Sequence, residues 1–142
     1  GGRRFRRMKS FSMDNTAAGM ERVMDEVEVL LAARGASAKR QFAVRLALDE
    51  LLSNIVKYAH DDGQVHPISV HLEPDEPAHL VLEDDGRPFN PLADAPAPVL
   101  AGPGEDRPIG GLGLHLLQSM GLKLDYRREH GRNILRVDFP PG

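Results

Sequence analysis

A long segment rich in proline and glycine, residues 86–113, is the feature that most restricts how this chain can fold. It holds 6 of the 11 prolines and 6 of the 14 glycines, so we expect no regular helix or strand within it. A loop of this length inside a compact domain is usually a functional lid or a disordered segment. The regular elements must therefore lie on either side of it.

On both sides of this segment the hydrophobic pattern shows either a helical period or a period of two. This pattern predicts an α+β fold, with a mixed or antiparallel sheet covered on one face by helices. The expected elements, in order, are a strand at 8–13, a helix capped by Asp14 or Asn15 and ended by Gly35, a helix from Ser37 to about Ala59, strands at 68–72 and 80–82, the lid, a helix at 114–120, and a hairpin of strands at 123–129 and 132–139.

Length and composition indicate one domain with an ordinary core. A chain of 142 residues predicts a single domain, here 8–142. We expect the basic residues 1–7 to be a solvated tail or a remnant of cloning or, alternatively, a nucleic-acid arm. No apolar run could span a membrane, and no secretory signal is recognisable. The absence of cysteine excludes disulfides and thiolate metal sites, and the net charge of −3 gives no drive toward nucleic acid. We expect a cytoplasmic protein with no membrane or direct nucleic-acid partner.

The second helix carries three polar residues on one flank of its apolar stripe. Glu50, Asn54 and Lys57 follow the spacing i, i+4, i+7, and the neighbouring positions Ala43 and Ala47 leave this flank uncovered. An acid, an amide and an amine beside the core would suit the edge of a groove for a polar ligand. The alternative interpretation is an ordinary surface network between residues at helical spacing.

Asp84 is predicted to point toward the buried face of its strand. It shares parity with Leu80 and Leu82, and an inward carboxylate is unfavourable unless a donor hydrogen-bonds it. Because Asp84 precedes Gly86 at the end of the strand, a ligand could supply that donor. The alternative is a carboxylate that caps the turn of an Asp-Asp-Gly sequence.

A third candidate segment, residues 110–114 (GGLGL), immediately precedes the last predicted helix. Glycines allow the backbone to approach a ligand closely, and the free N–H groups of a helix N-terminus bind phosphate. The alternative is a flexible hinge of the lid.

Three segments taken together resemble the N box and the two glycine boxes of the GHKL ATPase superfamily: 50–54 (ELLSN), 84–89 (DDGRPF) and 111–114 (GLGL). Within that superfamily, residues 46–58 and 84–91 look most like the bacterial anti-sigma regulatory kinases of the RsbW/SpoIIAB type. The resemblance extends over nearly the whole chain, about 8–140. It implies the Bergerat fold, a two-layer sandwich in which ATP lies under a mobile lid.

The resemblance also implies roles for individual residues. Glu50 would be the general base, and Asn54 would hold Mg²⁺ through its amide oxygen. The remaining ATP-binding residues implied are Asp84 at the adenine amino group, Lys57 at phosphate, Gly86, Gly111 and Gly113 at points of close backbone approach, Leu114 at a helix start that faces phosphate, and Arg107, the arginine nearest the second glycine box, toward the γ-phosphate.

The function implied is that of an ATP-dependent serine/threonine protein kinase that doubles as an anti-sigma factor, with ATP and Mg²⁺ as cofactors. It would phosphorylate a small anti-sigma-factor antagonist of the STAS type and hold a sigma factor in the alternative complex, and the nucleotide would bias this choice. A homodimer formed through the first helix and the leading strand is left open.

Two departures from the resemblance keep alternatives open. Arg107 lies four residues before Gly111 rather than almost adjacent to the second glycine box, and 87–89 (RPF) replaces a glycine-containing form of the first box. The main alternative is therefore a nucleotide-responsive protein-binding module without phosphotransfer. A histidine kinase fragment is a third alternative.

The six histidines show no spacing typical of metal ligands, and we interpret them as surface or packing residues. On the helical wheel His60 lies on the side that faces water, and His115 is expected on the surface of the last helix.

Overall fold

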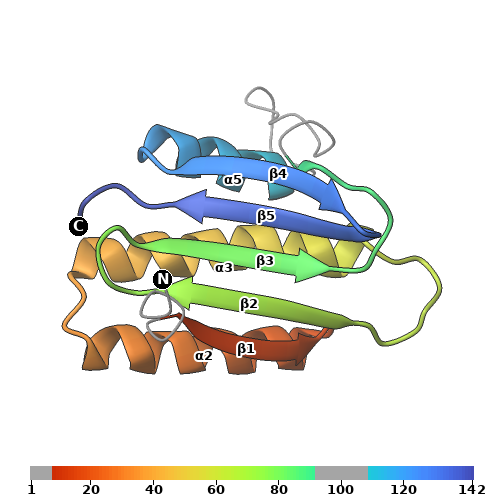
Figure 1. Ribbon diagram of the computed structural model, residues 1–142, viewed down its shortest axis with the longest axis horizontal. Helices are drawn as coiled ribbons and strands as arrows, with labels where there is room; N and C mark the ends of the chain where they lie inside the picture. Colours follow the sequence, from red (N-terminus) through yellow and green to blue (C-terminus); the bar gives the residue numbers. More distant parts are fainter. Residues whose placement is uncertain (1–7, 92–108) are drawn as a thin grey trace, which may run out of the picture.

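The computed structural model describes residues 8–91 and 109–142, with side chains described from Gly113 onward in the second range. Figure 1 shows the described elements in chain order. None of the helices in these two ranges is long and apolar enough to cross a membrane. The elements are β1 (Lys9–Asp14), α2 (Ala17–Ala33), α3 (Ala38–Tyr58), β2 (Pro67–Glu73), β3 (His79–Asp84), α5 (Ile109–Ser119), β4 (Lys123–Glu129) and β5 (Arg132–Asp138).

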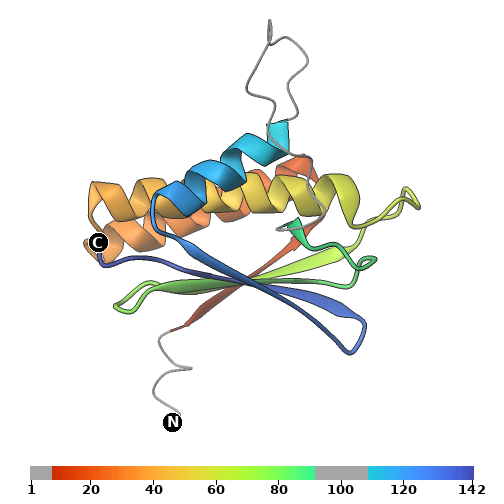
Figure 2. The same cartoon turned by 90° about the horizontal axis from the view of Figure 1, so that it is seen from above.

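The strands form one five-stranded sheet in the order β1-β2-β3-β5-β4, and every neighbouring pair is antiparallel. Figure 2 shows that α2, α3 and α5 all lie on one side of this sheet. The predicted α+β class with helices on one face is confirmed. Of the two sheet types expected, the antiparallel one is present.

The core lies between the helices and the inner face of the sheet. Inward side chains alternate along β2 and β3, where Ile68, Val70, Leu72 and Leu80 are fully buried. Helix α3 covers the middle of the sheet (Figure 1) and has ten buried residues. Its apolar face is consequently held against the strands, which fixes the orientation of the polar residues on its flank.

The first helix begins later than the sequence suggested. We expected Asp14 or Asn15 as its N-cap, but the cap is Thr16, whose side chain accepts a hydrogen bond of 3.0 Å from the backbone N–H of Gly19. Asp14 is instead the last residue of β1. The Asn15 side chain accepts from the backbone N–H of His66 at 2.8 Å, so a tertiary contact uses the oxygen that could have capped the helix.

The boundaries between α2 and α3 match the prediction. Gly35 has a positive φ of 70°, the left-handed conformation that ends a helix readily at glycine. Ser37 is the N-cap of α3 and accepts from the backbone N–H of Arg40 at 3.0 Å. Helix α3 ends at Tyr58, with Ala59 as its C-cap.

The last helix begins five residues earlier than expected. We predicted a start at Leu114 and no regular structure in 86–113, but α5 spans Ile109–Ser119 and includes the glycine segment. Glycine weakens a helix by roughly 1 kcal/mol relative to alanine. Here tertiary packing overrides that preference, because a Cβ atom on Gly113 would lie 2.0 Å from Oε1 of Glu50. Residues 92–108, with most of the expected lid, lie outside the described residues.

Candidate functional site

Glu50 and Asn54 form a buried polar pair on α3. Their exposed fractions are 8% and 2%, and the side-chain N–H of Asn54 donates to Oε2 of Glu50 at 3.2 Å. Lys57, the third polar residue on the same flank, is exposed. The structure therefore places the acid and the amide together inside the domain, with the lysine at the rim.

The surroundings of Glu50 raise the pKa of its carboxyl above the ordinary value. Burial raises the pKa of its carboxyl and the charge of Asp49 adds to this, while the Asn54 hydrogen bond and the charge of Lys57 oppose it only in part. The backbone of α5 passes directly beside the carboxylate at Gly113. A carboxyl group with a raised pKa is better matched to accepting a proton near neutral pH than an exposed one.

Asp84 points inward, as its strand parity predicted, and is 3% exposed. Its Oδ1 accepts from the backbone N–H of Gly86 at 2.8 Å and from the side-chain N–H of Asn133 at 2.9 Å. The turn-capping bond of the alternative interpretation is thus present. Among the described residues, both bonds fall on Oδ1, so Oδ2 can still accept from a ligand.

Asn133 is a candidate site residue that the sequence analysis missed. It is 4% exposed and lies opposite Asp84 in the β3–β5 register. Its inward parity with Leu135 and Val137 on β5 was the available signal. Its amide joins five groups: the Asp84 carboxylate (2.9 Å) and the Arg87 carbonyl (2.9 Å) as acceptors, and Tyr126 OH (2.5 Å), Arg128 Nη1 (3.1 Å) and the Phe89 N–H (3.3 Å) as donors.

A pocket lies between the C-terminal half of α3 and the ends of β3 and β5. Its polar side chains are Asn54, Asp84 and Asn133, and the rest of its lining is apolar: Leu51, Ile55, Ala59, Phe89, Pro91, Tyr126 and Leu135. An apolar pocket with a few convergent polar groups is typical of small-molecule sites. A flat heteroaromatic ring with an exocyclic N–H donor would match the inward carboxylate.

Gly86 packs against the C-terminal end of α3. A Cβ atom at Gly86 would lie 2.5 Å from the carbonyl oxygen of Ala59, so no side chain fits there. The following residue, Arg87, donates its backbone N–H to that same carbonyl at 2.9 Å and its Nε to the carbonyl of Tyr58 at 2.7 Å. This glycine thereby holds the end of β3 against α3, which sets the position of Asp84.

The other predicted site residues are placed as follows. Leu114 is 8% exposed and packs in the core, and it lies inside α5 rather than at a helix start. Gly111 lies in the first turn of α5, and Arg107 lies outside the described residues. His115 is exposed, as expected.

The expectation that His60 faces water is wrong. Helix α3 ends two residues before His60, so the helical wheel does not apply, and only 10% of its side chain is exposed.

Comparison with known proteins identifies the fold. Residues 13–139 match the family model of the histidine kinase-like ATPase domain. The histidine kinase domain of a blue-light activated histidine kinase from Erythrobacter litoralis superposes with a TM-score of 0.54 at 16% identity, over 85% of this chain and 60% of that one. At this identity the likeness supports the shared fold alone.

Two sequence relatives are protein kinases. The chain is 35% identical over 104 residues to the serine/threonine-protein kinase BtrW of Bordetella bronchiseptica, covering 71% of each protein. It is 29% identical over 99 residues to the serine-protein kinase RsbW of Halalkalibacterium halodurans, covering 68% of this chain and 60% of that relative. Given a family match over nearly the whole domain, an antiparallel sheet covered by helices and these relatives, the chain belongs to the histidine kinase-like ATPase family of the GHKL superfamily.

Proposed function

We propose that this protein is an ATP-dependent serine/threonine protein kinase that also acts as an anti-sigma factor. The observation that carries the proposal is the buried Glu50–Asn54 pair beside the pocket that Asp84 lines, where burial raises the pKa of the Glu50 carboxyl. The two kinase relatives support phosphotransfer rather than ATP binding alone.

ATP would bind with its adenine in the apolar pocket. The exocyclic amino group of adenine would donate to Oδ2 of Asp84, while Asn133 and the Gly86 N–H hold the other oxygen. Asn54 uses its N–H to reach Glu50, so its Oδ1 can serve as a hard oxygen ligand for Mg²⁺. The ion would neutralise phosphate charge, and Lys57 at the rim would add a further positive charge.

Glu50 would act on the acceptor hydroxyl. Its carboxylate takes the proton from the serine or threonine hydroxyl of the substrate as that oxygen forms a bond to the γ-phosphorus. The bond from the γ-phosphorus to the β–γ bridging oxygen breaks, and ADP leaves. The products are ADP, the phosphorylated partner and a protonated Glu50.

The proposed phosphoacceptor is a small antagonist protein of the STAS type, and the partner of the alternative complex is a sigma factor. This assignment rests on the likeness of residues 46–58 and 84–91 to the anti-sigma kinases. Phosphorylation of the antagonist would release it and leave this chain free to bind the sigma factor.

The direct test is transfer of radiolabelled γ-phosphate from ATP to a STAS-type antagonist by the unaltered protein, Glu50→Gln and Asp49→Asn. Asp49 is the exposed neighbour of Glu50 on α3 and serves as the matched control. We expect Glu50→Gln to reduce transfer by about 100-fold or more, which is the usual contribution of a general base, and Asp49→Asn to leave it unchanged.

Binding measurements on the same variants separate catalysis from recognition. Glu50→Gln should retain nucleotide binding and nucleotide-dependent binding of the antagonist. Partner binding that responds to nucleotide, without transfer even by the unaltered protein, would instead establish the non-catalytic module.

A further inference from the structure

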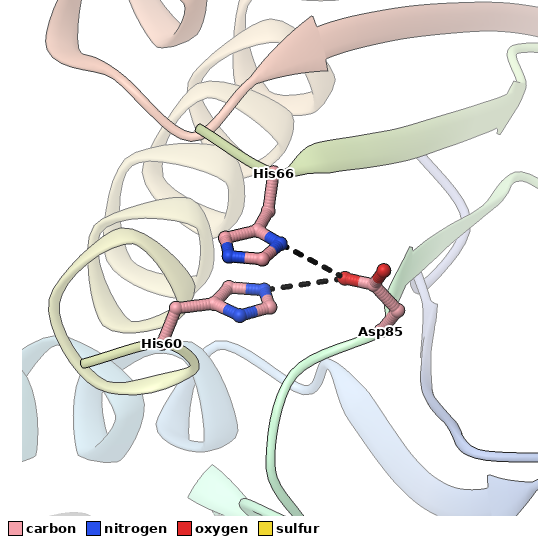
Figure 3. A group of neighbouring side chains, drawn as sticks. All are labelled: His60, His66 and Asp85. Atoms are coloured by element: carbon pink, nitrogen blue, oxygen red, sulfur yellow. Dashed lines mark ion pairs between the residues drawn. The ribbon is translucent and has the colours of Figure 1, made fainter. Parts of the chain in front are cut away.

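Three side chains outside the nucleotide pocket converge from separate parts of the chain. His60 follows α3, His66 precedes β2, and Asp85 follows β3; Figure 3 shows both imidazoles directed at the same carboxylate oxygen. Nε2 of His60 and Nδ1 of His66 lie 3.3 Å and 3.9 Å from Oδ1 of Asp85. One candidate ligand atom from each residue lies within 4.8 Å of the other two. We call these residues the histidine–aspartate cluster.

His60 presents a buried nitrogen whose hydrogen-bonding capacity is unused. Its side chain is nine-tenths buried, and Nε2 has no hydrogen-bond partner among the residues that the structure describes. The Asp85 oxygen lies nearby but outside hydrogen-bond geometry. Because an unsatisfied buried polar atom costs free energy, this nitrogen is suited to a ligand that enters between it and Asp85.

His66 is oriented by a second carboxylate. Its Nε2 lies 2.8 Å and 3.0 Å from the two oxygens of Asp62, which accept the proton on that nitrogen. Nδ1 then carries the lone pair and faces the cluster. A histidine that binds metal through one nitrogen and donates its other N–H to a carboxylate is the usual arrangement in metal sites.

We propose that the histidine–aspartate cluster binds a divalent transition-metal ion of the Zn²⁺ class. The ligands are Nε2 of His60, Nδ1 of His66 and a carboxylate oxygen of Asp85, and water completes a tetrahedral shell. Ligands about 2.1 Å from a tetrahedral ion lie about 3.4 Å apart, and the two nitrogens lie 3.3 Å and 3.9 Å from the Asp85 oxygen. Two imidazoles with one carboxylate favour Zn²⁺ over Mg²⁺, which prefers oxygen ligands only.

Metal binding requires a rearrangement of the two rings. They are stacked with their centroids 3.5 Å apart and their planes 1° from parallel, whereas an ion lies in the plane of each imidazole that binds it. Rotation about χ2 must therefore open the stack. Asp85 is about half exposed, so an ion and its water can enter from solvent on that side.

The ion would connect three parts of the fold. His60 extends from the end of α3, where the Ala59 carbonyl accepts from the N–H of Arg87, and Asp85 directly follows Asp84. A shared ion would hold the end of β3 against α3 and restrict the position of Asp84. This inference does not depend on phosphotransfer, because it concerns residues outside the proposed catalytic pair.

The test is a titration of the untagged chain with Zn²⁺ against a chromophoric chelator, together with the visible spectrum of the Co²⁺ form. His60→Gln and Asp85→Asn remove ligands. His71→Gln is the matched control, because His71 also pairs with a carboxylate, Glu83, at 3.0 Å, but it does so away from the cluster. All variants are checked by circular dichroism and thermal unfolding.

We expect one equivalent of Zn²⁺ and a Co²⁺ spectrum of low coordination number. His60→Gln and Asp85→Asn should each weaken binding at least tenfold, and His71→Gln should not change it. Because Asp85 is exposed, its variant tests the site even if His60→Gln is unstable. Binding that is absent, or that all three variants retain equally, would overturn the proposal.

Discussion

Burial distinguishes Glu50 from the other acidic residues of α3. Its neighbour Asp49 faces solvent, whereas Glu50 is enclosed between α3 and the backbone of α5 at Gly113. Desolvation penalises the charged carboxylate, so the folded protein holds this proton more tightly than the unfolded chain. The property that suits Glu50 to accept a proton is therefore unfavourable for stability at neutral pH.

Glu50→Gln should stabilise the protein relative to the unaltered chain, and this advantage should grow as the pH rises. The pKa of Glu50 is raised above 4.5 in the folded state, so ionisation favours the unfolded chain from about pH 4.5 up to the folded pKa. Glutamine removes this penalty and can still accept the Asn54 hydrogen bond. Thermal unfolding at several pH values should show equal melting temperatures below pH 4.5 and a growing advantage for Glu50→Gln above it. The charge of Asp49 contributes less than burial to the raised pKa of Glu50, so Asp49→Asn should show a smaller growth. A lower melting temperature for Glu50→Gln at neutral pH would contradict this account.

At the scale of elements, the contact between α3 and α5 brings the backbone of α5 at Gly113 against Glu50, the proposed general base. Gly113 lies inside α5, where glycine is unfavourable by itself, and the Glu50 side chain occupies the space that a Cβ would need. Helix propensity and packing therefore oppose each other at this position, and their balance can be measured.

The effect of Gly113→Ala on the unfolding free energy should have opposite signs with glutamate and with alanine at position 50. In the unaltered protein the new Cβ overlaps Glu50 and should cost about 1–3 kcal/mol of unfolding free energy. In a Glu50→Ala background the overlap is gone, so the same change should stabilise the helix by roughly 0.5–1 kcal/mol. Denaturant unfolding of the four proteins gives both values. An equal cost in both backgrounds would show that Glu50 is not what Gly113 accommodates.

At the scale of the whole molecule, the pocket depends on three segments that are distant in sequence. Helix α3 supplies Asn54, β3 supplies Asp84, and β5 supplies Asn133, whose amide bonds the Asp84 carboxylate at 2.9 Å. A ligand that binds this assembled pocket binds the folded state only, so it must stabilise the entire domain.

Mg-ATP should raise the melting temperature. At about 100 times its dissociation constant a ligand adds roughly 2.7 kcal/mol, which corresponds to about 10 °C for a domain of this size. Asp84→Asn should abolish the increase, because asparagine keeps the Oδ1 bonds but replaces the Oδ2 acceptor with a donor. Asp125→Asn on the exposed side of β4 is the control and should retain it. The absence of any increase at saturating Mg-ATP would remove the basis for the nucleotide site.

The sequence by itself determined the order of the elements, the antiparallel hairpin at the C-terminus and the inward direction of Asp84. These features follow from local periodicity, because the period of the apolar residues identifies the element and its buried face. Likewise, the spacing of Glu50 and Asn54 was enough to place them on one flank of a helix.

Only the tertiary structure decided the partner of Asp84, the start of α5 and the meeting of His60 with His66 and Asp85. Each depends on how segments far apart in the chain pack: the β3–β5 register brings Asn133 to Asp84, and close helix packing accommodates Gly113. The spacing of residues within one segment does not indicate such tertiary contacts. Strand register and helix contact are determined by the packing of the whole core, which no single segment specifies.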